Sequence, residues 1–236
     1  AKMEQQWEEA LEDFRDDPQM RVALITGAGE KSFSTGPDLS EEAGPMATRA
    51  ADRASFWETS VKPRKYWVDM ELWKPIVAAV NGYCLGGGFE MALLADIIIC
   101  SESASFGLPE GALSRIPDGA GTQKLTRRIS FGMAMQMLLT GDRINAEEAL
   151  RAGLVNKVVP QAKLMTEAGK IAKRIASNGP LAMRAIKELG WNGSFEMGLS
   201  QGRRLEQMYA LINRETEDAS EGPRAWLDKR PPEYKA

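Results

Sequence analysis

One stretch constrains the fold more than any other: Lys74-Pro-Ile-Val-Ala-Ala-Val-Asn-Gly-Tyr-Cys-Leu-Gly-Gly-Gly-Phe-Glu90. Its apolar, β-branched start predicts a buried strand over residues 75–80, and the three consecutive glycines predict a tight junction into a helix over 87–95. Glycines let backbone approach backbone, or let a ligand approach bare N–H groups. Glu90 follows them inside an apolar run, where an unpaired charge is costly. Two interpretations fit: a strand-to-helix junction with a salt-bridged Glu90, or a site that stabilises negative charge and moves a proton.

Composition limits the chemistry. The chain has 236 residues, 43% hydrophobic and 27% charged, with a net charge of −3 and a pI near 5.3. That balance indicates a globular protein without the basic field of a nucleic-acid binder, and no apolar run reaches the ~18 residues that span a membrane. We therefore expect neither nucleic acid nor membrane as a partner. Residues 1–7 are already charged and helix-like, so we expect no secretory signal and a cytoplasmic protein, although an organelle matrix also fits.

The chain contains no histidine, which removes Ser-His and Cys-His mechanisms and the commonest metal ligand. Cys84 and Cys100 stand in or beside apolar runs and are interpreted as buried thiols. Proton transfer is left to Asp, Glu, Lys and Tyr. We expect no metal site.

Hydrophobic periodicity predicts an α/β core followed by a helical appendage. Expected strands are residues 21–26, 75–80, 96–100 and 154–159. Expected helices are 2–15, 65–73, 87–95, 119–129, 131–139, 146–152, 161–176, 181–189 and 195–219. Residues 31–38 are expected to form a loop, and residues 40–62 a mobile lid or surface segment. The core is placed at 1–178 and the helical region at 179–236.

Two further acids stand in turns. Glu110 follows Pro109, and alone it is most simply a solvated loop acid. Asp118 lies in a Gly/Pro turn, and alone it is most simply the N-cap of the next helix. Spacing by itself does not bring Glu90, Glu110 and Asp118 together.

Several motifs together resemble the crotonase, or enoyl-CoA hydratase/isomerase, superfamily over nearly the whole chain. They are Phe33-Ser-Thr-Gly-Pro-Asp-Leu39, the stretch from Ala79 to Asp96, Phe106-Gly-Leu-Pro-Glu110, Ile116-Pro-Asp-Gly-Ala-Gly-Thr-Gln-Lys-Leu125, Leu139-Thr-Gly-Asp-Arg-Ile144 and residues 149–159. The resemblance implies a spiral of ββα turns with a C-terminal trimerisation region. The strands that usually open the family's fold, before the first helix, are absent from this sequence. The resemblance also implies an acyl-CoA thioester substrate, no separate cofactor, and trimers or hexamers.

The resemblance also assigns roles. Glu90 and Glu110 match the acids that move protons to and from water and C2. Gly87 matches one donor of the oxyanion hole, and Pro37 matches the other, although proline has no N–H. Three explanations fit this departure: the Asp38 N–H shifts into place, a water takes the position, or the enzyme is weak or inactive on standard substrates.

Further matching positions are assigned to CoA and substrate binding: Ser34, Gly36, Asp38, Leu39 and Gly86. Residues 40–66 are expected to shape the acyl pocket, and Lys229 and Arg230 are candidates for binding the CoA phosphates. Ile186, Leu189, Trp191, Met197 and Leu199 are interpreted as interface or core.

The leading functional hypothesis is a 2-enoyl-CoA hydratase that uses Glu90 and Glu110. An alternative is a dienoyl- or enoyl-CoA isomerase, or a carnitinyl-CoA-type dehydratase, in which Asp118 takes part, because some relatives carry an acid there. A third is a non-catalytic acyl-CoA-binding member, suggested by Pro37.

Overall fold

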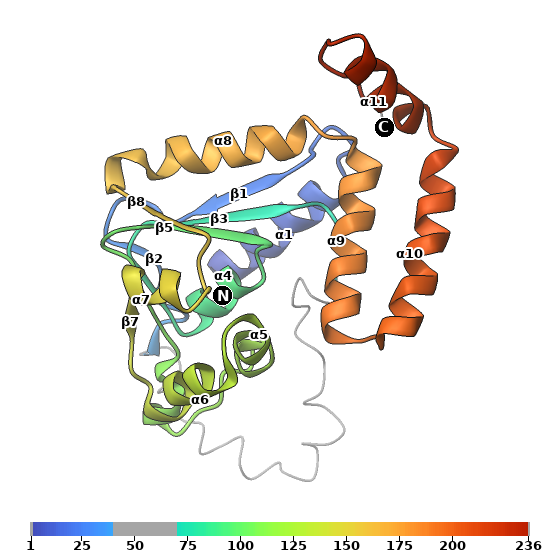
Figure 1. The fold of residues 1–236 in the computed structure, drawn as a ribbon. Helices are drawn as coiled ribbons and strands as arrows, with labels where there is room; N and C mark the ends of the chain where they lie inside the picture. The colour runs from blue at the N-terminus through green and yellow to red at the C-terminus, as the bar shows by residue number, and fades with distance from the viewer. Residues whose placement is uncertain (1, 40–69, 236) are drawn as a thin grey trace.

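The computed structural model describes residues 2–39 and 70–235 and contains two four-stranded sheets (Figure 1). The first has the order β1-β3-β5-β8, with all neighbours parallel. The second has the order β2-β4-β6-β7, in which only the β6–β7 pair is antiparallel. The strands are β1 (Ala23–Thr26), β2 (Ser32–Ser34), β3 (Ile76–Val80), β4 (Tyr83–Leu85), β5 (Ile97–Ser101), β6 (Ser105–Gly107), β7 (Ile144–Asn145) and β8 (Lys157–Val159).

The chain visits the two sheets alternately, one short strand after the other. β1 and β2, β3 and β4, and β5 and β6 form successive coils, so each coil stacks on the one before it. This is the ββα spiral that the resemblance implied. The strands of the second sheet, at two or three residues each, were not predicted individually, and β2 falls within the predicted loop at 31–38.

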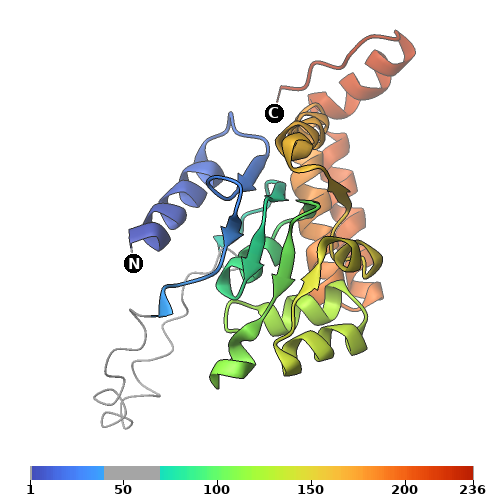
Figure 2. The ribbon, with the colours of Figure 1, turned by 90° about the vertical axis from the view of Figure 1, so that its left-hand side faces the viewer.

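Strand β3 has apolar residues on both faces because both are covered. Its five residues are all buried. Ile76, Ala78 and Val80 face the main core, while Ala79 packs in a second cluster with residues of α8 (Leu164–Ala176). In Figure 2, α8 and the N-terminal helix α1 (Lys2–Asp16) lie on opposite sides of the strands. A strand covered on both faces loses the period-2 pattern, as parallel sheets do.

The side chain of Asn81 joins the coils at the end of β3. Its Oδ1 accepts the N–H of Gly27 at 3.2 Å, and its Nδ2 donates to the carbonyls of Gly29 at 2.8 Å and Ser32 at 3.1 Å. Asn81 is 3% exposed, so these bonds satisfy a polar group in the core. They hold the turn between β1 and β2 against the next coil.

Helices follow most of the predicted ranges. They are α1, α4 (Gly87–Leu93), α5 (Gly121–Arg128), α6 (Phe131–Thr140), α7 (Ala146–Arg151), α8, α9 (Pro180–Phe195), α10 (Leu199–Arg214) and α11 (Glu217–Leu227), with 3₁₀ turns η4 (Pro109–Leu113) and η5 (Gln161–Lys163). No helix in residues 2–39 or 70–235 is long and apolar enough to cross a membrane. The lid predicted at 40–62, and most of the helix predicted at 65–73, lie outside the described residues.

The single helix predicted over residues 195–219 is wrong. Phe195 ends α9, Gly198 precedes α10, and a second break follows Arg214. There the Thr216 hydroxyl accepts the N–H of Ala219 at 3.2 Å and caps α11. Glycine and threonine at these positions favour helix starts over continuation.

The C-terminal helices extend away from the spiral. α9 lies beside the core, α10 returns along it, and α11 projects beyond them (Figure 1). No residue of α10 is buried, and Ile186 and Leu199 are 61% and 83% exposed in the single chain. These side chains are therefore not core. Their role at an interface, and the division at residue 178, stay predictions.

Candidate active site

Glu90 is a buried residue in the first turn of α4, and backbone N–H groups hold its carboxylate. Its Oε1 accepts hydrogen bonds from Gly119 N at 2.7 Å and Gly121 N at 2.8 Å, and the residue is 6% exposed. The sequence left open a salt-bridged Glu90. Among residues 2–39 and 70–235 both donors to its carboxylate are backbone amides, so the structure does not show that salt bridge. Two amides on one oxygen leave Oε2 as the atom that can exchange a proton with a ligand.

Glycine is required where the next coil meets this carboxylate. A Cβ on Gly119 would lie 2.6 Å from Glu90 Oε2, and one on Gly121 would lie 2.7 Å from Oε1. These two glycines were not among the predicted partners of Glu90. The signal was present in the turn Pro117-Asp-Gly-Ala-Gly121, whose glycines are two residues apart, but nothing in the spacing pointed to Glu90.

Glu110 lies in the first turn of η4 and faces the glycine turn that starts α4. Its Oε1 is 3.1 Å from the point where a Cβ on Gly86 would stand, and Gly86 has a φ of +54°. The side chain is half-buried, and its Oε2 is buried with no hydrogen-bond partner among the described residues. Glu110 is therefore not a solvated loop acid. An unpartnered buried carboxyl oxygen is available to a ligand.

Asp118 is exposed and does not cap α5. The residue before that helix is Ala120, which has a φ of +73° and contributes no side-chain hydrogen bond. The prediction of Asp118 as a helix cap is therefore wrong, because the chain turns through a left-handed residue first. The charge of Asp118 instead raises the pKa of both Glu90 and Glu110. The fold thus brings together the three acids that sequence spacing left apart.

Burial controls the protonation of the two glutamates. It raises the pKa of Glu90 from its ordinary 4.5 to about 7, against the lowering effect of the Gly121 and Gly119 N–H groups, and the charges of Glu110 and Asp118 add to the rise. Burial also raises the pKa of Glu110, with Asp118 adding to it. A carboxyl group with a pKa of about 7, as Glu90 has, exchanges protons near neutral pH, as general acids and bases must.

Gly87 and Pro37 come together beside these acids. Gly87 is the first residue of α4, where N–H groups have no partner within the helix. A Cβ on Gly87 would lie 3.5 Å from the Pro37 Cδ, and one on Gly36 would lie 3.0 Å from Gly87 N. Gly36 has a φ of +82°, which suits this close approach. The pair therefore offers the Gly87 N–H and no N–H from Pro37.

The other predicted binding residues lie on or beside the same loop. Ser34 is half-buried and its Oγ accepts the Gly36 N–H at 3.3 Å, whereas Asp38 and Leu39 are exposed. Their binding roles stay predictions. In the tail, Arg230 pairs with Glu221 at 2.6 Å. Within the described chain no group of three or more His, Cys, Asp or Glu side chains is arranged to hold a metal.

Comparisons with known proteins identify relatives of this chain. A sequence model described as enoyl-CoA hydratase/isomerase matches residues 1–236. A carnitinyl-CoA dehydratase of Proteus mirabilis is 42% identical over 239 residues, which cover 100% of this chain and 89% of that protein. A carnitinyl-CoA dehydratase of Salmonella enteritidis is 42% identical over 233 residues, covering 96% and 86%.

Solved structures are similarly close. The crystal structure of an enoyl-CoA hydratase from Bacillus anthracis has a TM-score of 0.86 and 40% identity, covering 98% of this chain and 87% of that one. The structure of Pseudomonas aeruginosa DspI has a TM-score of 0.85 and 32% identity, covering 96% and 84%. The spiral of short strands, the paired glutamates and these matches lead to one conclusion: the chain belongs to the enoyl-CoA hydratase/isomerase family of enzymes, which act on acyl-CoA thioesters.

Proposed function

We propose that this enzyme reversibly adds water across the 2,3 double bond of a 2-enoyl-CoA thioester. The supporting observation is the pair formed by Glu90 and Glu110 beside the glycine start of α4. Hydration of an enoyl thioester needs a base for the attacking water and an acid for C2, and two carboxyl groups in different environments can divide these tasks.

The surroundings of Glu90 and Glu110 indicate which of them is the base and which is the acid. Two N–H donors stabilise the ionised form of Glu90, so Glu90 is proposed as the base that takes a proton from water. Burial raises the pKa of both glutamates, so the division rests on their hydrogen-bond donors: no N–H reaches the Oε2 of Glu110 within the described chain, and Glu110 is therefore proposed as the acid that protonates C2. In the reverse, dehydrating direction each group takes the opposite role.

Negative charge that develops on the thioester oxygen requires a donor. The Gly87 N–H at the start of α4 is proposed for this task, together with Gly86, whose left-handed φ sets the turn. Pro37 supplies no second N–H, so we expect slower turnover than a two-donor site would give. Ser34, Gly36, Asp38 and Leu39 are proposed to line the CoA entrance.

The test follows the conjugated absorbance of crotonyl-CoA with purified protein, with the Glu110→Gln variant alongside. We expect the absorbance to fall with wild type and to change at least ~100-fold more slowly with the variant. Equal rates in the two proteins would refute the assignment. No hydration, combined with double-bond migration in a dienoyl-CoA, would support the isomerase alternative.

A second candidate differs in the acyl group. The relatives named carnitinyl-CoA dehydratase are 42% identical to this chain, and Asp118 adds a third carboxylate to the site. A carnitinyl group carries a fixed positive charge, which clustered carboxylates attract. We expect Asp118→Asn to lower kcat/KM for crotonobetainyl-CoA and to leave that for crotonyl-CoA nearly unchanged. Equal losses with both would remove the electrostatic argument.

We further propose a cytoplasmic homotrimer, alone or paired into a hexamer, that needs no separate cofactor because CoA enters as part of the substrate. The support is the exposed apolar surface of the C-terminal helices, which in the single chain includes Ile186, Leu199, Met208, Leu211 and Ile212. Sedimentation equilibrium of the whole protein tests the assembly, and a monomer would refute it.

A further inference from the structure

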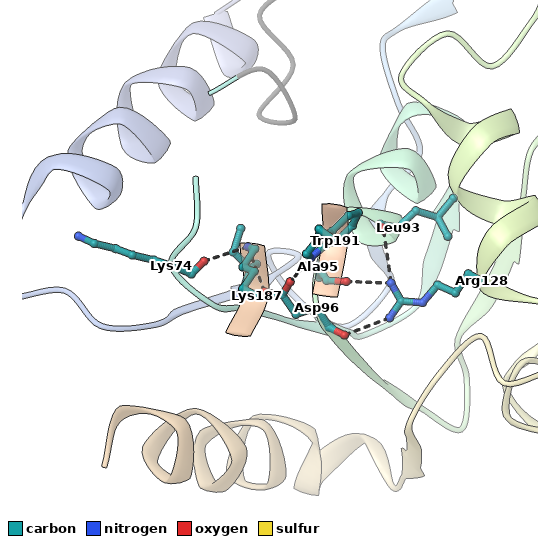
Figure 3. Close-up of polar contacts among 8 residues, drawn as sticks. Lys74, Leu93, Ala95, Asp96, Arg128, Lys187 and Trp191 are labelled. Atoms are coloured by element: carbon teal, nitrogen blue, oxygen red, sulfur yellow. Dashed lines mark hydrogen bonds and ion pairs between the residues drawn. The ribbon is translucent and has the colours of Figure 1, made fainter. Parts of the chain in front are cut away.

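The two helices that form the site are tied together at both ends. At the start of α5, Gly121 N donates to Glu90 of α4 at 2.8 Å. At its end, Arg128 Nη1 donates to the carbonyls of Leu93 at 3.3 Å and Ala95 at 2.8 Å, where α4 ends. Figure 3 shows the guanidinium turned toward these carbonyls and that of Asp96. The carbonyls at a helix end have no partner within the helix, so the half-buried guanidinium of Arg128 satisfies them.

A second link to the same two helices comes from α9. Trp191 Nε1 donates to Asp96 Oδ1 at 2.7 Å, and the Trp191 ring lies 3.5 Å from Lys124 Nζ of α5. Lys124 is 8% exposed, and Phe195 stacks on Trp191 with ring centroids 5.0 Å apart. Figure 3 shows Trp191 and Lys187 of α9 both meeting Asp96, and Lys187 Nζ lies 3.1 Å from its Oδ2.

We propose that Arg128 and Trp191 are positioning residues for Glu90, because both join the end of α4 to α5 and so fix the distance over which the Gly119 and Gly121 amides reach the carboxylate. Neither residue is among those assigned to substrate. The proposal gives the C-terminal helical region a role in the site beyond assembly. Its effect on turnover rests on the proposed function, in which Glu90 takes a proton from water.

The expected effect has a definite sign. If α5 shifts, the two amides that favour ionised Glu90 are weakened while burial remains, so the pKa of Glu90 rises. The charged groups facing Glu90 are Glu110 from η4 and Asp118 from the turn before α5, and neither substitution removes them. A weakened hydrogen bond to a charged group shifts a pKa by about one unit.

The decisive experiment measures Glu90 directly, without turnover. Whole protein labelled with ¹³C at glutamate carboxyl carbons is titrated by NMR, and Glu90→Gln identifies the Glu90 signal. The variants are Arg128→Met and Trp191→Phe, with Arg128→Lys as the conservative replacement. The matched control is Arg127→Met: Arg127 is the neighbour on α5, and its hydrogen bonds go to Gln123 within that helix.

We expect the Glu90 midpoint to rise by about one pH unit in Arg128→Met, less in Trp191→Phe and Arg128→Lys, and not in Arg127→Met. The acidic limb of kcat for crotonyl-CoA should move with it, about ten-fold in rate on that limb, while KM stays constant. Wild-type midpoints in both Arg128→Met and Trp191→Phe would overturn the proposal. If Arg128→Met does not fold, Trp191→Phe decides. Absence of crotonyl-CoA hydration in wild type would refute the proposed function but not this one, because the titration needs no activity.

Discussion

Replacing Glu90 by Gln should stabilise the protein while it removes activity. Gln keeps an oxygen that can accept the Gly119 and Gly121 N–H groups, and its amide NH₂ would replace the buried Oε2. The substitution therefore retains the local hydrogen bonds and removes a charge that burial disfavours. Groups shaped for catalysis often lower stability in this way.

The magnitude follows from the protonation of Glu90 in the two states. Its pKa is about 7 when folded and 4.5 as an ordinary glutamate. Below 4.5 the carboxyl is protonated in both states and contributes no difference. Between 4.5 and about 7 the unfolded state loses the proton first, so stability falls as pH rises, and above 7 the full cost of about 3 kcal/mol is present. Between pH 5 and pH 8, the free energy of unfolding of wild type should fall by about 2.5 kcal/mol relative to that of Glu90→Gln.

Urea unfolding of both proteins at pH 5 and pH 8, at one protein concentration, measures this difference. Carboxyl groups that do not interact with Glu90 titrate equally in both proteins and cancel. Glu102→Gln, at an exposed position after β5, controls for the loss of one carboxylate in general. If Glu90→Gln is less stable than wild type by the same amount at both pH values, the reasoning about burial is refuted.

Three further substitutions test other parts of the site. Pro37→Ala restores an N–H opposite Gly87 and should raise kcat by up to ~100-fold, whereas an unchanged kcat would show that this N–H does not reach the thioester oxygen. Gly119→Ala places a Cβ 2.6 Å from Glu90 Oε2 and should lower kcat at least ~10-fold with little change in KM; steady-state kinetics decide. Burial lowers the pKa of Lys124 from 10.5 to about 8. The free energy of unfolding of wild type should therefore rise by up to about 3 kcal/mol relative to that of Lys124→Met between pH 8 and pH 10.5. The same pH dependence of the unfolding free energy in both proteins would contradict this.

The elements with strong local signals were predictable from the sequence. The apolar run predicted a strand at 75–80, and the glycines predicted a helix at 87–95. The observed β3 (Ile76–Val80) and α4 (Gly87–Leu93) differ from these bounds by no more than two residues. By contrast, β4 and β6 have three residues each, too few to show a period. Their pairing depends on the coils that stack beside them, which a local pattern does not contain.

Glu90 was a candidate from its own segment, but that it meets Glu110 and Asp118 was predictable only through resemblance. Glu90 and its donor Gly121 are 31 residues apart, and they meet because successive coils of the spiral stack. Asp118 illustrates the converse error: an acid shortly before a helix is often a cap, but the left-handed Ala120 places the helix start beyond its reach. The C-terminal breaks at Gly198 and Thr216 have residue types that favour helix starts, and the single helix predicted over 195–219 did not take this signal into account.

The hydrogen bonds between Glu90 and the following coil also lead us to expect an order of folding during synthesis. Glu90 leaves the ribosome 29 residues ahead of Gly119, an interval of roughly 1.5 to 6 s at typical elongation rates. Throughout that interval the nascent α4 carries a carboxylate without its amide partners, and this discourages the helix from docking into the growing core. We therefore expect α4 to dock only after the turn at residues 117–121 has been synthesised, so that the acid required for chemistry also sets when the middle of the protein folds.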